Sequence, residues 1–357
     1  MEAATETVQE SGALSFKFTG NGKEYFGIWI VNLLLSIVTL GIYSAWAKVR
    51  RMQYFYRNTS LAESHFDYHG SPTMILKGRL IVVALLVAYN LAERFSPPLA
   101  MIAFVCLAAG MPFLLMRSLR FKLFNSSYRG LRFHFKGSLG GAYKVFLMWP
   151  ILSAITLYTL APVWHQRLKD YQHNNSAYGK ANFSFNVPVS AFYKIYLTVG
   201  AVLIGLIVAI GFLFGGAIFE QIKSTAGGGN GYMNPKTMLL LFTFPLMIFG
   251  VGLLLRPYFA ARFQNLIWNN THLGPHRFVS NISARKLLLI EVTNMIGIIF
   301  TLGLFKPFAV IRTMQYKLES LALIPHGDLE SFVASQEAQV SATGQEAADL
   351  FDIDIAL

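Results

Sequence analysis

Long apolar runs separated by short polar stretches follow one another along most of this chain. About 20 apolar residues cross the hydrocarbon core of a bilayer as a helix, and four runs reach that length. They come in two pairs, residues 75–92 with 98–116 and residues 192–219 with 237–255. These runs predict two pairs of full-length membrane helices.

Three shorter apolar runs each lead through a turn into a more polar helix, and the segments around the turns resemble one another. Residues 38–54 recur in related form as residues 155–171 and 300–316, and two weaker copies share the same frame. An arginine marks the equivalent position in all five copies: Arg50, Arg117, Arg167, Arg262 and Arg312. This recurrence predicts a protein built from repeated units, at about residues 14–65, 66–132, 133–182, 183–277 and 278–326.

Each unit opens on a short alternation of apolar and polar residues, typical of a strand. Phe16 to Phe18, Phe66 to Tyr68 and Phe133 to Phe135 are the clearest examples. The predicted fold class is an all-α polytopic membrane protein of five repeated helical hairpins, three short or re-entrant and two full-length. Short β-strand segments lie on its cytoplasmic face. Residues 1–13 are expected to be disordered.

Composition agrees with a membrane protein. The chain is 54% hydrophobic and 13% charged, whereas a soluble domain carries roughly 25% charged residues. Ten of its 18 acidic residues lie within residues 1–16 and 328–357, and all 30 Lys and Arg residues lie between these ends. No nucleic-acid-binding motif accompanies this charge, so we expect the bilayer and its anionic lipids as partners, and no nucleic acid. A homo-oligomer is compatible with the sequence.

The distribution of Lys and Arg bears on topology, because basic loops stay on the cytoplasmic side. If each unit leaves from and returns to that side, all the basic loops share it and both termini are cytoplasmic. A count of apolar runs instead gives about seven single crossings, which would place some basic loops outside. The charge favours the hairpins, although repeats can also invert.

Several motifs resemble a known family. Phe26-Gly-Ile-Trp-Ile-Val-Asn, Thr39-Leu-Gly-Ile-Tyr-Ser-Ala-Trp and Phe66-Asp-Tyr-His-Gly-Ser-Pro resemble the YjgN family of bacterial inner-membrane proteins, named for domain of unknown function 898. The resemblance covers about residues 15–325. It implies a multi-pass protein of the bacterial inner membrane, and it supplies no substrate or catalytic residue.

The five equivalent arginines are candidate ligands for an anion, since guanidinium binds phosphate or carboxylate in bidentate fashion. They would equally serve to anchor helix ends at the lipid headgroups. Ionisable or polar residues within apolar runs are functional candidates by default, namely Glu291, Lys306, Asn294 and Asn32. Glu291 and Lys306 would pair across the fifth hairpin, face a hydrated cavity or lie at the interface.

Nothing in the sequence indicates an enzyme, a cofactor or a bound metal. His65 with His69, and His272 with His276, have the spacing of half a zinc site, but no further ligands complete either pair. We therefore expect a transporter or channel-like conduit for an anionic or lipid-like substrate. The alternative is a non-transporting scaffold or lipid-organising module that binds headgroups or proteins through its basic face. The acidic tail, residues 327–357, either docks on that face or stays in solvent.

Overall fold

The computed structural model describes residues 12–226 and 235–341. Its strands are β1 Leu14–Ser15, β2 Lys17–Phe18, β3 Thr59–Leu61, β4 Ser64–Tyr68, β5 Ser126–Tyr128, β6 Leu131–Phe135, β7 Ser176–Tyr178, β8 Ala181–Phe185, β9 Thr271–Leu273, β10 His276–Ser280 and β11 Leu321–Ile324. The helices of the first half are α1 Gly22–Val38, α2 Ser44–Arg57, α3 Pro72–Phe95, α4 Pro97–Phe124, α5 Leu139–Tyr143, the π-helix η1 Lys144–Met148, α6 Trp149–Ile155 and α7 Ala161–Asn174. Those of the second half are α8 Val189–Ala226, α9 Pro235–Trp268, α10 Ala284–Phe300, α11 Lys306–Glu319 and α12 Leu329–Ser341.

The strands form one antiparallel sheet of eleven strands that almost closes into a barrel. Its order runs β1-β11-β10-β9-β8-β7-β6-β5-β4-β3-β2. The two end strands, β1 and β2, are separated in the chain by Phe16 alone. The Phe16 backbone N–H donates to the Leu321 carbonyl at 3.1 Å, while β2 pairs with β3 on the other side. A single N-terminal stretch therefore bridges both edges and leaves little strand edge exposed.

Aromatic side chains fill the interior of the sheet. Five phenylalanines, one from each successive part of the sheet, pack in series with ring centroids 6.1 to 6.5 Å apart: Phe16, Phe66, Phe133, Phe183 and Phe278. The buried hydroxyl of Tyr178 donates to the Tyr128 carbonyl at 2.9 Å, and the Tyr128 hydroxyl donates to the Leu61 carbonyl at 2.8 Å. Because these buried hydroxyls have acceptors, the aromatic core avoids the cost of unpaired polar groups.

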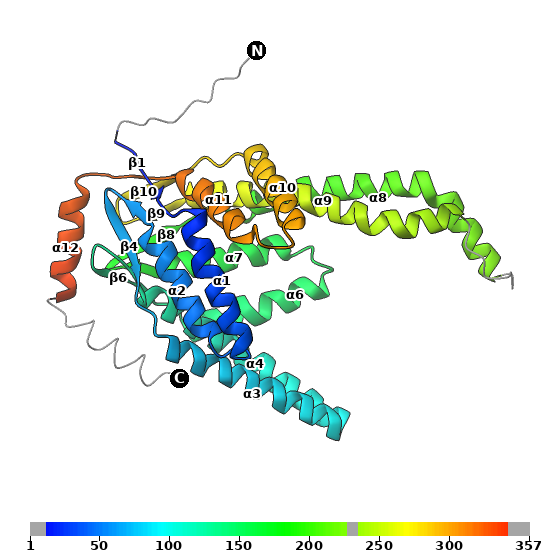
Figure 1. Cartoon of the computed structure of the whole chain (residues 1–357), viewed down its shortest axis with the longest axis horizontal. Helices are drawn as coiled ribbons and strands as arrows, with labels where there is room; N and C mark the ends of the chain where they lie inside the picture. The colour runs from blue at the N-terminus through cyan, green and yellow to red at the C-terminus, as the bar shows by residue number, and fades with distance from the viewer. Residues whose placement is uncertain (1–11, 227–234, 342–357) are drawn as a thin grey trace, which may run out of the picture.

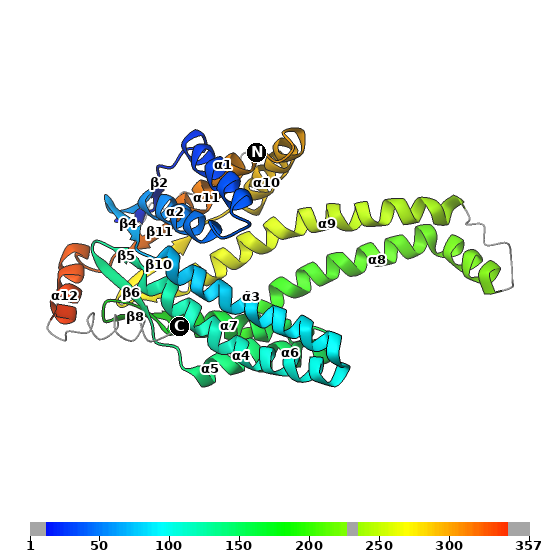
Figure 2. The same cartoon turned by 60° about the horizontal axis from the view of Figure 1, so that its bottom comes forward.

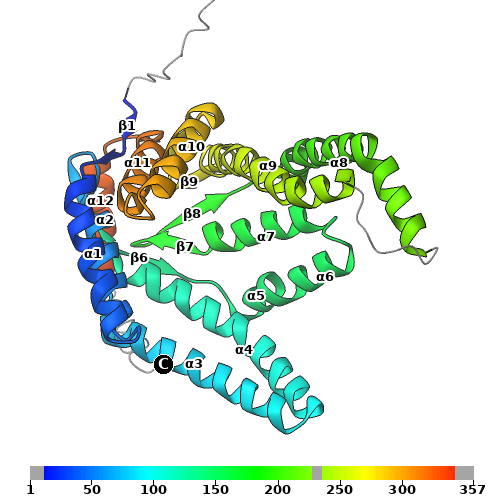
Figure 3. The same ribbon diagram turned by 45° about the vertical axis from the view of Figure 1, so that its right-hand side comes forward.

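The helices leave one side of the sheet in antiparallel pairs that fan outward (Figure 3). Within pairs, α1 packs on α2, α3 on α4, α8 on α9, and α10 on α11. Between pairs, α1 also contacts α11, α2 contacts α3, and α9 contacts α10. The pairs α3–α4 and α8–α9 extend furthest from the sheet (Figures 1 and 2).

Four helical segments of the described residues are long and apolar enough to cross a membrane: Pro72–Phe95, Pro97–Phe124, Val189–Gly216 and Phe242–Trp268. They correspond to the four long apolar runs of the sequence. At most 17% of the apolar window of any of them is buried within the protein, so their surfaces are available to lipid. Helices α1 and α10 have 17 residues each, which is about 25 Å at 1.5 Å per residue. They are therefore shorter than these four helices.

The predicted fold class was wrong. The chain is not all-α, because an eleven-stranded antiparallel sheet joins its helices, and the structure does not reduce to five repeated hairpins. The helix pairs differ in kind. In the third pair along the chain, the first arm is broken into α5, η1 and α6, and α7 is the second arm. Two other pairs, α3–α4 and α8–α9, are far longer than the rest. The strands are two to five residues long, too short for a strong alternation signal, and β1 pairs with β11 from the other end of the chain.

The start of the C-terminal tail is helical. Helix α12 packs on the side of the sheet opposite the helix pairs (Figure 1). Leu329 and Val333 are buried there, and the Gln336 Oε1 accepts a hydrogen bond from the Lys180 backbone N–H at 3.0 Å. Residues 329–341 are therefore docked on the sheet. The acidic end, residues 342–357, lies outside the described residues, as do residues 1–11 of the expected disordered N-terminus.

Candidate anion-binding groove

A groove of about 1240 Å³ lies between α2, α3, α4 and β6. Helix α3 contributes Thr73 to Val83, the half that follows strand β4, and α4 contributes the face from Leu114 to Phe124. Proline suits the first turn of a helix, where its missing N–H has no partner to lose, and Pro72 starts α3 there. The start of α2 closes the groove, with Ser44 accepting a hydrogen bond from Arg79 of α3.

Basic side chains surround this groove. The lining includes six Lys and Arg residues and no acidic residue: Lys48, Lys77, Arg79, Arg117, Arg120 and Lys136. They come from α2, α3, α4 and β6, so the fold collects positive charge from segments far apart in the sequence. Such a concentration without counter-charge raises the local concentration of anions.

Lys48 shows the effect of this crowding. It lies on α2, outside the four candidate membrane spans. Burial lowers the pKa of Lys48, and the nearby charges of Arg79 and Lys122 lower it further. Lys122 in turn lies close enough to Lys169 of α7 to lower the pKa of Lys169, after burial as the larger cause. A row of mutually repelling cations thus runs from the groove toward α7, and an anion in it would be stabilised.

Two arginines of α4 have hydrogen-bond donors that no protein group accepts. The Nε atoms of Arg117 and Arg120 are buried and have no hydrogen-bond partner. The Arg120 Nη2 donates to the Gly137 carbonyl at 3.1 Å, and the Arg117 guanidinium lies 5.4 Å from the Phe113 ring centroid. A buried donor without an acceptor costs about 1–3 kcal/mol, so an acceptor from a ligand would recover that free energy.

The groove also has apolar lining residues. Leu80 and Val83 of α3 are 56% and 54% exposed, and Leu40, at the turn before α2, is 94% exposed. Side chains of this kind favour contact with hydrocarbon over water. The groove can therefore hold a molecule with an anionic head and an apolar chain.

The comparisons with known proteins agree with a membrane role. A family described as bacterial protein of unknown function, DUF898, matches residues 13–350. The chain belongs to the DUF898 family. An inner membrane protein YjgN from Salmonella typhimurium is 25% identical over 355 residues, covering 88% of this chain and 89% of the relative. The YjgN proteins of Escherichia coli O157:H7 and strain K12 are each 33% identical over 147 residues, covering 41% of this chain and 37% of each relative.

No solved structure matches the chain. The family resemblance inferred from the sequence motifs is confirmed. The relatives are inner membrane proteins, and four helices of this DUF898 chain are long and apolar enough to cross a bilayer. The chain is therefore an integral membrane protein.

The DUF898 fold separates the five equivalent arginines. Among them, Arg117 belongs to the groove lining, whereas the other four are exposed on different helices. Arg50 donates to the Tyr43 hydroxyl at 3.5 Å, Arg262 lies 5.4 Å from the Tyr258 ring centroid, and Arg167 is exposed on α7. Anion binding by these exposed arginines stays a prediction.

Arg312 has a specific partner among the predicted polar residues. Its Nη1 donates to the Asn294 Oδ1 at 2.8 Å, and the Asn294 Nδ2 donates to the Ala309 carbonyl and to the Thr313 hydroxyl, both at 3.1 Å. Asn294 thus ties α10 to α11. Asn32, at the matching position of α1, is also buried, but its Oδ1 has no partner.

Glu291 and Lys306 do not pair. Lys306 is exposed at the start of α11, Glu291 is half-buried on α10, and no ion pair joins them in the described structure. An ion pair does link Arg57 and Asp67, whose Nε and Oδ1 atoms lie 2.8 Å apart.

The histidines of the DUF898 chain pair with other groups. A His69 ring nitrogen lies 2.8 Å from the Ser127 hydroxyl, and the His276 Nδ1 accepts the His326 backbone N–H at 3.1 Å. No group of three potential metal ligands occurs in residues 12–226 and 235–341.

Sequence reasoning missed most of the groove. Arg79, Arg120 and Lys136 fall outside the repeating arginine frame, so nothing marked them apart from their charge. Their shared surroundings arise when α2, α3, α4 and β6 pack together. The one available signal was the scarcity of acids in the middle of the chain, which left these cations without local counter-charges.

Proposed function

We propose that this protein is a membrane conduit that moves an anionic, lipid-like substrate along the groove between α2, α3 and α4. One observation carries the proposal: a groove lined by six cations, no acidic residue and several exposed apolar side chains. It lies beside two helices that are long and apolar enough to cross the bilayer. A charged head and an apolar chain would each find a matching surface.

A lateral route fits the structure better than an axial one. The interior of the sheet is filled by the five phenylalanines and by Tyr128 and Tyr178. Helix α12 covers the far side of the same cluster. A packed core of this kind has few voids large enough even for water, so the substrate would pass beside the sheet.

Charge supports an orientation with the sheet, and therefore α12, in the cytoplasm. Basic residues cluster where the helices meet the sheet: Lys23, Lys77, Arg79, Lys144, Lys194, Arg285 and Lys286. The turns at the far ends of the three short pairs, residues 35–44, 155–164 and 296–305, contain no charged residue. By the positive-inside rule, this pattern favours an orientation with the sheet and both described chain ends on the cytoplasmic side. Anionic lipids of that leaflet would be the partners.

The second candidate is a non-transporting scaffold that organises anionic lipids. It is favoured by the wide separation of α3–α4 from α8–α9 (Figures 1 and 3) and by their exposed apolar surfaces. Such surfaces also suit contact with a second copy of the chain. In either case we propose that the protein binds lipid without converting it chemically, and that it has no nucleic-acid partner.

Lipid movement in proteoliposomes separates these candidates. Fluorescent phosphatidylglycerol is placed in both leaflets, and a membrane-impermeant reductant quenches the outer leaflet. With the wild-type protein, we expect the inner pool to become quenchable over time. The double variant Lys48→Gln, Arg117→Gln should slow this exchange, whereas the control Arg285→Gln should not.

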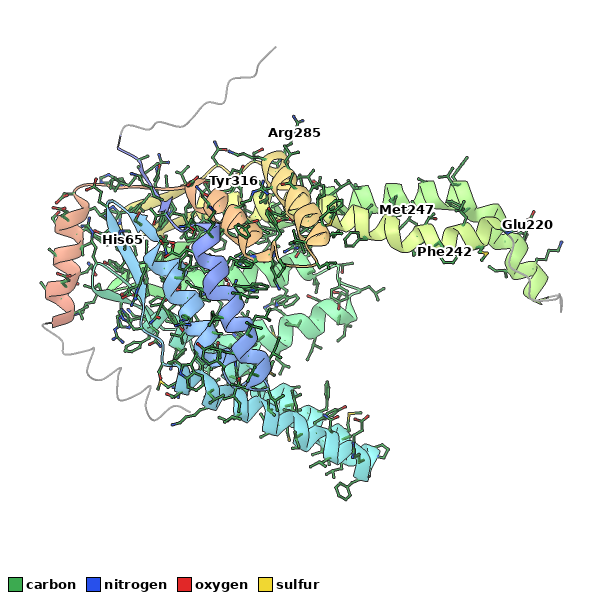
Figure 4. All side chains as sticks on the ribbon, in the orientation of Figure 1. His65, Glu220, Phe242, Met247, Arg285 and Tyr316 are labelled. Atoms are coloured by element: carbon green, nitrogen blue, oxygen red, sulfur yellow. The ribbon has the colours of Figure 1, made fainter. Side chains whose placement is uncertain are left out.

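Arg285 suits this control because it lies at the start of α10, on the opposite edge of the molecule from α3 and α4 (Figure 4). Wild-type protein that retains bound anionic lipid but exchanges none would contradict the conduit and favour the scaffold. Equal slowing by Arg285→Gln would show that the groove has no special role.

A further inference from the structure

The groove carries more positive charge than a singly charged lipid would neutralise. This inference rests on the proposed function and concerns the headgroup. Arg79 and Lys122 both lie close enough to Lys48 to lower its pKa, after burial as the larger cause. Arg117 and Arg120 line the same groove. The charged groups that face the groove are cations from α2, α3, α4 and β6, with His134 of β6 as the remaining titratable one.

The two arginines on α4 can converge on one group. Arg117 and Arg120 are three residues apart, so their side chains project from the same face of the helix. Both keep a buried Nε–H without an acceptor. A phosphate monoester offers three acceptor oxygens, and arginine pairs with phosphate through two parallel hydrogen bonds. One phosphate held between them would accept hydrogen bonds from both guanidinium groups.

The charge of the headgroup follows from its neighbours. At neutral pH a phosphate monoester carries about −1.5 to −2 charges, since its second pKa is near 6, whereas a phosphodiester carries a single charge. Arg117 and Arg120 together carry two positive charges, which a phosphate monoester nearly balances and a phosphodiester balances only by half. Lys48 and Arg79, which repel each other when the groove is empty, gain most from the extra charge.

The apolar lining residues favour a lipid over a small phosphate ester. The groove, at about 1240 Å³, exceeds the roughly 300–1,000 Å³ of ordinary small-molecule sites. Leu80, Val83 and Leu40 present apolar surface along it. We propose that the groove selects lipids with a phosphate-monoester headgroup over phosphodiester lipids and over water-soluble phosphates, with Arg117 and Arg120 holding the phosphate and Lys48 and Arg79 supplying the remaining charge.

Binding of matched lipids tests this selection. The purified full chain in neutral detergent is titrated at pH 7.5 with dioleoyl phosphatidic acid, phosphatidylglycerol and phosphatidylcholine, and binding is followed by native mass spectrometry. We expect phosphatidic acid to bind about tenfold more tightly than phosphatidylglycerol, as one additional charge-assisted contact would give. Phosphatidylcholine should bind most weakly, and glycerol 3-phosphate should compete poorly.

Conservative variants identify the residues. Arg117→Lys and Arg120→Lys keep the charge but lose the planar guanidinium, so they should reduce the preference for phosphatidic acid while binding to both anionic lipids persists. Arg285→Lys should leave the preference intact. Lys48→Gln provides a second check that leaves both α4 arginines in place. It too should reduce the difference in affinity between phosphatidic acid and phosphatidylglycerol.

Equal affinities of the wild-type protein for phosphatidic acid and phosphatidylglycerol would overturn the proposed headgroup, even if fluorescent phosphatidylglycerol still crosses the bilayer. Effective competition by glycerol 3-phosphate would overturn the lipid requirement. Selective binding of phosphatidic acid without lipid movement would leave this inference standing and refute the conduit.

Discussion

Asn294 and Asn32 offer a matched test of how the short helix pairs are held together. Each is the eleventh residue of a 17-residue helix, α10 and α1 respectively, and each is buried, at 5% and 8% exposure. Asn294 makes hydrogen bonds to three residues of α11. The Oδ1 of Asn32 has no donor. Replacing either by leucine, which is close in volume, isolates the hydrogen bonds from packing.

Asn294→Leu should lower the free energy of unfolding by about 2 kcal/mol. The bonds to the Ala309 carbonyl and the Thr313 hydroxyl contribute about 1 kcal/mol each. The bond from Arg312 adds less, because this exposed guanidinium can exchange its partner for water. Asn32→Leu should leave the free energy of unfolding unchanged or raise it by up to about 1 kcal/mol, since it removes a buried carbonyl that lacks a partner.

Unfolding of the purified protein by sodium dodecyl sulfate, followed by far-ultraviolet circular dichroism, measures both variants under one condition. Comparison of the two variants cancels the effect of the detergent on helices of similar composition. Equal destabilisation by the two substitutions, or a larger loss for Asn32→Leu, would refute the assignment of stability to the Asn294 hydrogen bonds.

Three further predictions concern the sheet and the topology. Gln336→Ala removes the acceptor for a backbone N–H of the sheet and should speed amide exchange within α12 about fivefold, equivalent to about 1 kcal/mol, without changing exchange in α4. Burial raises the pKa of Asp67, but hydrogen bonds from Arg57 and a backbone N–H lower it to a net value below the ordinary 3.8. The stabilisation that ionised Asp67 gives the folded state is present above pH 3.8 and is lost as the pH falls through the lower folded-state pKa. The free energy of unfolding of Arg57→Gln should therefore depend less on pH below about 4 than that of the wild-type protein. The topology is tested by single cysteines in a variant without the native cysteine. A cysteine at exposed Glu63 should not react with an impermeant maleimide added to intact cells, whereas a cysteine at exposed Leu157 should react. The reverse pattern would contradict the proposed orientation.

The site was predicted in part. Arg117 stood out because it shares a frame with four other arginines, and it does line the groove. The same frame also pointed to Arg50, Arg167 and Arg262, which the fold leaves exposed on separate helices. Equivalent positions in a sequence share a local environment, but they face the same ligand only if the packing of their helices brings them together.

The sequence by itself determined the membrane character, the family, and the four long helices. These follow from the cost of placing polar groups in hydrocarbon, which acts on each segment separately and is recorded in local composition. The tertiary structure alone decided that the short strands join into one nearly closed sheet, with Phe16 between its two end strands and residues 329–341 docked against it. Strands of two to five residues have little stability of their own, so they form through pairing with partners remote in the chain, and no local pattern specifies those partners.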